Sequence, residues 1–125
     1  MPAMTLAAPI LPGKEEEWRR FVQDVTEEFP DNYEEFRRRL GFSNESVWLV
    51  RMDGVETAMA YLEAEDPARV LVALIDPKRP FDTWLKGRLS ELHGDALARM
   101  PRRTMAELIF TRQDVPREAH REPLP

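Results

Sequence analysis

Hydrophobic residues follow two different spacings at the start of the chain. Thr5–Leu11 is a short apolar run closed by Pro12 and Gly13, which predicts a first strand. Pro9 removes one ladder donor, so we expect this strand to lie at a sheet edge or to break there. The next apolar residues recur with a period of 3.6 and predict a helix that ends before Pro30: Trp18, Phe21, Val22, Val25 and Phe29.

A second, shorter helix is predicted from about Asp31, with Gly41 as its C-terminal stop. Its apolar edge consists of Tyr33, Phe36 and Leu40. The same helix carries three consecutive arginines at positions 37 to 39, a run that on its own resembles a nucleic-acid patch. Four glutamates lie close enough in the sequence to neutralise this charge: Glu27, Glu28, Glu34 and Glu35. We therefore expect a solvated helix face there.

The strongest local signal in the chain is a β-hairpin. Ser46–Met52 and Val55–Ala64 are strand-like and are joined by Asp53-Gly54, a dipeptide that favours a tight hairpin turn. In the resulting register Ala58 and Ala60 share one face, and their small side chains let helices approach closely. The other face is large and apolar, and it holds Trp48, Val50, Met59 and Tyr61.

Two more helices and a strand complete the predicted order. Asp66-Pro67 begins a helix that runs to about Ile75, and another covers Phe81–His93. Met105–Arg112 is predicted to be the last strand. With each helical connection counted once, the first broken at Pro30 and the second at Pro77 to Pro80, the order β-α-β-β-α-β indicates an α+β, ferredoxin-like antiparallel sheet with helices on one face. We expect residues 5–112 to form this single domain and residues 113–125, rich in proline and charge, to form a flexible C-terminal tail.

The composition argues against several classes of function and identifies none. The 125 residues suit one domain, and 42% hydrophobic residues suit a globular one. The net charge of -5 argues against nucleic-acid binding, and the absence of cysteine excludes thiol chemistry. No segment has the length of a membrane span or the pattern of a signal peptide, so we expect a cytoplasmic protein. No metal-ligand spacing or phosphate loop is present, so no cofactor is predicted.

The apolar face of the hairpin implies a partner. A sheet with helices on one side usually shows polar residues on the other, whereas this face carries Trp48, Val50, Met59 and Tyr61. A second copy is the simplest cover, because a two-fold axis lets one patch bury itself. Two such sheets would make a dimeric α/β-barrel. The alternatives are that the tail or the segment Asp31–Gly41 folds over the sheet, or that a different protein covers it.

Four segments resemble a known family: Leu11–Lys14 leading into a Trp-bearing helix, Ser46–Leu49, Pro80–Trp84 and Leu92–Gly94. They look like an uncharacterised family of small bacterial proteins in the dimeric α/β-barrel superfamily. The likeness covers about residues 5–112. It implies the fold and leaves the function open, since the superfamily includes monooxygenases, haem enzymes, isomerases and proteins without known activity.

Two residues are candidate catalytic groups. His93 is the only histidine in the predicted domain and therefore its only ordinary group that titrates near neutrality. It ends a helix, so the simpler interpretation is that it caps the helix in its protonated form. Glu63 falls on the same strand face as Met59 and Tyr61, where an unpaired carboxylate would be a base with a raised pKa. Alternatively, Glu63 lies solvated at the rim.

Four further residues are candidate ligand contacts. Trp48, Met59 and Tyr61 share the apolar sheet face and would line the interior of a barrel, and Trp84 would add an aromatic wall. Each is also a plausible core residue. Two functions stay open at this point. Either the barrel interior binds or transforms a small apolar or aromatic metabolite, or the chain is a non-catalytic homodimeric module with a closed interior.

Overall fold

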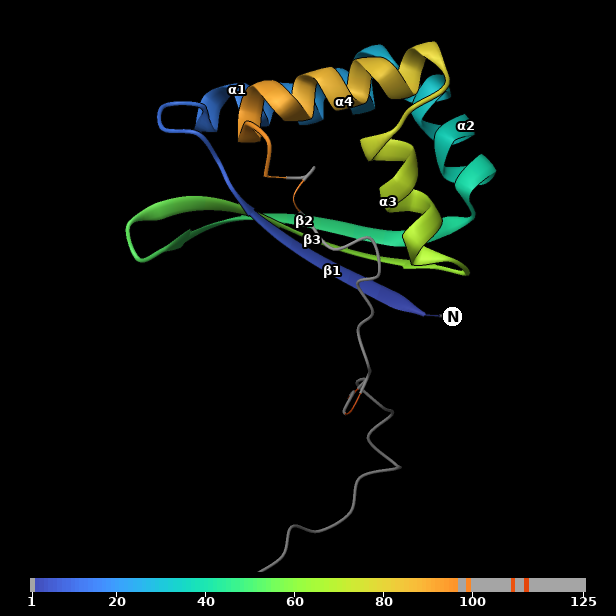
Figure 1. Ribbon diagram of the computed structural model, residues 1–125, viewed down its shortest axis with the longest axis horizontal. Helices are drawn as coiled ribbons and strands as arrows, with labels where there is room; N and C mark the ends of the chain where they lie inside the picture. The colour runs from blue at the N-terminus through green and yellow to red at the C-terminus, as the bar shows by residue number, and fades with distance from the viewer. Residues whose placement is uncertain (1, 97–98, 100–108, 110–111, 113–125) are drawn as a thin grey trace, which may run out of the picture.

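The computed structural model describes residues 2–96, 99, 109 and 112, and its elements form a sheet covered by helices on one side (Figure 1). Its elements follow in the order β1 (Ala3–Pro9), α1 (Glu15–Gln23), the π-helical turn η1 (Asp24–Glu28), α2 (Pro30–Leu40), β2 (Phe42–Met52), β3 (Val55–Ala64), α3 (Pro67–Ile75) and α4 (Pro80–His93). None of these helices has the length and hydropathy needed to cross a membrane. The predicted strand at 105–112 and the predicted tail at 113–125 fall almost entirely outside the described residues.

The sheet is antiparallel with the strand order β1-β3-β2. The hairpin register is the predicted one, with Trp48 opposite Met59 and Val47 opposite Ala60. At the turn Asp53 and Gly54 have φ values of 51° and 76°, the left-handed pair that a tight two-residue hairpin requires. The Asp-Gly dipeptide therefore fixes the register of the whole hairpin.

A β-bulge interrupts β2 near its start. Ser43 pairs with Glu63 and Ser46 with Tyr61, so two residues of β2, Asn44 and Glu45, stand opposite one residue of β3. Asn44 takes a left-handed conformation with φ 49°, which asparagine tolerates better than most residues. The strand was expected to begin at Ser46, and it begins four residues earlier because the bulge accommodates the polar stretch before it.

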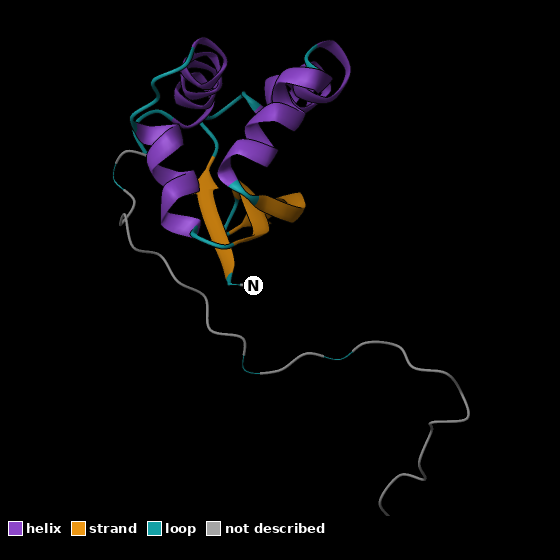
Figure 2. Ribbon diagram, turned by 90° about the vertical axis from the view of Figure 1, so that its right-hand side faces the viewer, coloured by secondary structure: helices purple, strands orange, loops and turns teal. Residues whose placement is uncertain are grey.

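All the helices lie on the alanine-bearing face of the sheet, as expected (Figure 2). Between the two layers lies a core that draws on every helix and strand, with Met4, Trp18, Phe21, Phe36, Leu62, Val70, Leu85 and Leu92 among its buried members. The opposite face remains uncovered in the described structure. There Trp48 is 52% exposed, Met52 49% and Val55 45%.

An ion pair holds α2 against α4. Arg39 near the end of α2 donates to the carboxylate of Asp82 at 2.9 Å, and Asp82 is almost fully buried. The guanidinium of Arg39 also lies 5.7 Å from the ring centroid of Phe36. Removing one partner of such a buried pair would leave an uncompensated charge. The pair therefore fixes the position of α2, which carries Tyr33.

Candidate functional site

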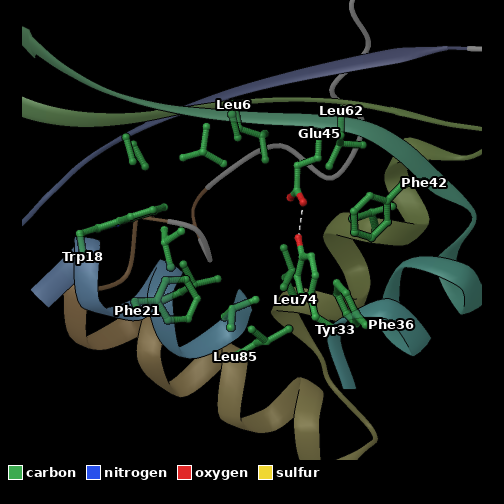
Figure 3. Close-up of a pocket in the computed structure, with 18 of the residues that line it drawn as sticks. Leu6, Trp18, Phe21, Tyr33, Phe36, Phe42, Glu45, Leu62, Leu74 and Leu85 are labelled. Carbon is green, nitrogen blue, oxygen red and sulfur yellow. Dashed lines mark hydrogen bonds between the residues drawn. The ribbon is translucent and has the colours of Figure 1, made fainter. Parts of the chain in front are cut away.

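A cavity of about 220 Å³ lies between the sheet and the helices (Figure 3). Every described helix and strand contributes to its wall, which is mainly aliphatic and aromatic. Some of the lining residues reach the protein surface, where Val22 is 39% exposed and Val47 is 41% exposed. Thr26 and Glu45, which also line the cavity, are exposed as well. The cavity therefore meets solvent between α1–η1 and β2.

The carboxyl group of Glu45 meets the hydroxyl of Tyr33 inside this cavity (Figure 3). Tyr33 comes from α2 and donates its proton to Oε1 of Glu45. Glu45 as a whole residue is exposed at the edge of β2, but its carboxyl group turns inward among lining side chains. Burial therefore raises its pKa, against the opposing effects of Tyr33 and Arg37. Burial and the charge of Glu45 also raise the pKa of Tyr33.

The β-bulge explains why Glu45 points into the cavity. Strict alternation from Ser43 would put Glu45 on the uncovered face together with Ser43. The extra residue of the bulge resets the alternation, so Glu45 faces the helices. Asn44 instead reaches to the uncovered face, where its amide donates to Glu63 Oε2 at 2.8 Å. Bulges commonly re-aim a side chain in this way.

A second polar group lies at the opposite end of the cavity and is fully hydrogen-bonded. The indole N–H of Trp18 donates to His93 Nε2 at 2.8 Å, and His93 Nδ1 lies 2.7 Å from the carbonyl oxygen of Pro9. Because an indole can only donate, Nε2 must be the unprotonated nitrogen and Nδ1–H must donate to Pro9. His93 is thus held as one neutral tautomer.

The expected protonated helix cap at His93 is wrong. The ring bonds to β1 and α1 and not to the carbonyls at the end of its own helix. His93 is 6% exposed, and burial lowers its pKa despite the opposing bond to Pro9. A catalytic role for His93 stays a prediction, although both ring nitrogens are occupied.

The other predicted site residues lie away from this cavity. Trp48, Met59, Tyr61 and Glu63 lie on the opposite, uncovered face of the sheet. Trp84 packs in an aromatic cluster, 5.1 Å from Phe29 and 5.6 Å from Phe81 between ring centroids, and does not line the cavity. Of the six predicted residues, the cavity contains His93 alone. A ligand pocket in a barrel interior, lined by the residues of the uncovered face, stays a prediction.

Glu63 forms a small polar cluster on the uncovered face. Tyr61 donates its hydroxyl to Glu63 Oε1 at 2.7 Å, and Asn44 donates to Oε2. The bonds from Asn44 and Tyr61 lower the pKa of Glu63, so the expected raised pKa is wrong. The same contact raises the pKa of Tyr61. Glu63 is an ionised carboxylate held between two donors.

Sequence reasoning missed Glu45 and Tyr33, which form the polar pair of the cavity. The sequence contains only a weak signal for this pair. Tyr33 occupies an ordinary apolar position on its helix, and Glu45 precedes the predicted strand. Asn44 was the best clue, because asparagine is enriched at left-handed positions and such a position next to a strand predicts a bulge.

Comparison with known proteins identifies the fold class. No protein-family profile and no curated protein matches the sequence. Among solved structures, the crystal structure of L-rhamnose mutarotase from Formosa agariphila matches 90% of this chain and 100% of that chain, with a TM-score of 0.55 and 10% sequence identity. At this identity the likeness shows the fold alone. The expected α+β fold, an antiparallel sheet with helices on one face, is confirmed, whereas the dimeric α/β-barrel assembly and the narrower bacterial family stay predictions.

Proposed function

We propose that the chain forms a homodimer and binds one small, mainly apolar molecule in the cavity of each protomer. The observation that carries this proposal is the cavity itself, which is apolar, reaches the surface and has one polar pair, Tyr33 and Glu45, on its wall. Apolar pockets with a few placed polar groups are the usual form of small-molecule sites. The π-helical turn η1 contributes Val25 and Thr26 to the wall, and such turns are frequent at functional sites.

The cavity volume sets the size of the ligand. An apolar cavity of about 150 Å³ holds benzene, and pockets for drug-sized molecules have about 300–1,000 Å³. The value of about 220 Å³ lies between these limits. It suits a molecule of one or two rings.

The uncovered sheet face supports the homodimer. Trp48, Met52 and Val55 are each close to half exposed and share one face of the hairpin. A second copy would remove them from water, which is the main favourable contribution to most association. The cavities lie on the far side of each sheet, so dimerisation leaves both open.

Native mass spectrometry of the chain purified from its own host tests both parts of the proposal. We expect a dimer mass with a retained small molecule. Ala60→Leu should lose that molecule and keep the dimer, because Ala60 lines the cavity and has space beside it. The matched control is Lys86→Leu, which places the same apolar side chain on the exposed side of α4, away from the cavity. Equal retention in both variants would place the ligand elsewhere.

A second candidate function places a sugar in the barrel interior. The cluster of Asn44, Tyr61 and Glu63 beside the half-exposed ring of Trp48 favours it, since a carboxylate that accepts from hydroxyls and an aromatic ring suit a hydroxylated ligand. The solved structure with the same fold is named a rhamnose mutarotase. NMR exchange between the anomers of L-rhamnose tests this. An exchange rate equal to that in buffer, unaltered by Glu63→Gln, would exclude it.

A further inference from the structure

We propose that the ligand of the cavity is an aromatic molecule with one N–H or O–H donor and without a carboxylate or other anionic group. This inference rests on the proposed function and specifies the ligand class of the same site. It follows from the hydrogen-bonding capacity that the described lining side chains leave unused.

At the α4 end of the cavity, the side chains of Trp18 and His93 have no hydrogen-bonding capacity left for a ligand. The Trp18 N–H is used by His93, and both nitrogens of His93 are used by Trp18 and by the Pro9 carbonyl. A ligand that bonded to any of these atoms would have to break an existing buried hydrogen bond, which costs about as much as the new bond contributes. This end therefore recognises shape and not polarity.

Near the mouth, two hydroxyl donors are also used. Thr26 donates to the carbonyl of Val22 at 2.8 Å within its own helical turn, and Tyr33 donates to Glu45 Oε1. A hydroxyl has one proton, so neither group has a second to give. Among the described lining residues, no side-chain donor is thus left for a carbonyl or carboxylate of a ligand.

Acceptor capacity is left, on the hydroxyl oxygens of Thr26 and Tyr33 and most strongly on the carboxylate of Glu45. Among the described residues, Glu45 Oε1 accepts from Tyr33, while Oε2 has no hydrogen-bond partner. The bulge holds this carboxyl group at the cavity wall, where a bound ligand can reach it. An ionised carboxylate accepts bonds and does not donate them. It therefore attracts an N–H or O–H and repels an anion.

The remaining wall favours an aromatic body. The rings of Trp18, Phe21, Phe36 and Phe42 line the cavity together with Tyr33. Phe36 and Phe42 already form an edge-to-face pair with a centroid distance of 5.7 Å, the geometry that a further ring can extend. A planar ligand of one or two rings with a single donor uses both the rings and Glu45 Oε2.

A matched set of three probes tests this inference: indole, indene and indole-3-carboxylate. Indene has nearly the shape of indole without its N–H, and the third probe adds an anionic group. Binding is followed by chemical-shift titration of the protein's methyl groups at about pH 8, well above the ordinary range of a carboxyl pKa. We expect indole to bind at least about tenfold more tightly than indene, the usual value of a hydrogen bond to a charged group, and the carboxylate to bind most weakly.

Two variants locate the effect. Glu45→Leu should abolish the preference for indole over indene, and Glu63→Leu, on the opposite face, should retain it. Equal affinity of the wild-type protein for indole and indene would overturn the inference and leave the proposed cavity function intact. Tight binding of indole-3-carboxylate would also overturn it. If none of the probes shifts the cavity methyl groups, the proposed function itself fails. The wild-type comparison decides the question even if Glu45→Leu does not fold.

Discussion

At the scale of single residues, two glutamates on opposite sides of the sheet have opposite effects on stability. The pKa of Glu45 is raised by burial and that of Glu63 is lowered by its two donors. The ordinary value for both is 4.5. At neutral pH the burial of the Glu45 carboxyl group therefore costs folding free energy, a cost that disappears as pH falls through its raised pKa toward 4.5. Glu63 contributes stability above pH 4.5 that is lost as pH falls through its lowered pKa.

We therefore expect Glu45→Gln to raise the free energy of unfolding at pH 7 and Glu63→Gln to lower it. Each variant is the other's control, since both remove one negative charge. Urea unfolding of the three proteins at pH 7 and at about pH 4 measures the effect. The change in the free energy of unfolding that each substitution causes should be smaller at the lower pH. Shifts of the same sign at pH 7 would contradict this account.

His93 should give the protein a pH-dependent stability just below neutrality. Its folded pKa is lowered from 6.5, so between that value and the folded pKa the unfolded chain binds a proton that the folded chain does not. The free energy of unfolding should then fall as pH decreases from about 7 to 5. His93→Gln, whose amide can accept from Trp18 and donate to Pro9, should remove this slope. Glu45 titrates in both proteins, so its contribution cancels in the difference.

At the scale of elements, the bulge in β2 is the feature that makes the site. Asn44 has a φ of 49°, a conformation that costs a residue with a branched side chain about 1–2 kcal/mol. We expect Asn44→Val to reduce the free energy of unfolding by about that amount in urea unfolding. Ser43→Val, one residue earlier and in regular register with Glu63, is the control and should be nearly neutral. Equal losses in both variants would indicate a general intolerance of valine in β2.

The regular elements were predictable because each depends on local chemistry. Val55–Ala64 matches β3 residue for residue, and Gly41 ends α2 in the left-handed conformation that glycine favours. The π-helical turn was not predicted, since the residues after Gln23 continue a helical apolar stripe without interruption. The bulge was missed for a related reason. Both irregularities are fixed by packing between elements, which a periodic pattern does not encode.

The candidate site was less predictable than the fold. Alternation correctly placed Trp48 and Tyr61 on the uncovered face, and the single histidine of the domain does line the cavity. The cavity itself is the space that remains when the sheet and helices pack imperfectly, and no residue type signals it. Glu45 enters it through a one-residue change of register. A ligand site of this kind needs three-dimensional contacts to be found.

At the scale of the whole molecule, the proposed dimer makes thermal stability depend on protein concentration. Association stabilises the folded chain by mass action, so the Tm of the wild type should rise with concentration. The Tm of Trp48→Glu should not depend on concentration. The half-exposed position tolerates a charge in a separate protomer, but burying that charge in a dimer interface would prevent association. Val72→Glu, 41% exposed on α3, is the control and should keep the wild-type dependence. Sedimentation velocity measures the same difference as mass. A wild-type Tm that is independent of concentration would argue for a monomer.

The hydrogen-bonded group of Trp18, His93 and Pro9 has a consequence for how the chain folds during synthesis. The bond from His93 to the Pro9 carbonyl joins residues 84 positions apart, and Leu11 donates to the carbonyl of Leu92 beside it. A growing chain can form the β2–β3 hairpin early, because its contacts are local. The end of β1 can pair with β3 before then, but the Trp18 indole, the Pro9 carbonyl and the Leu11 N–H cannot bond to α4 until it has left the ribosome. The wall of the cavity therefore closes last, and until then the apolar residues that line it are exposed to the cell.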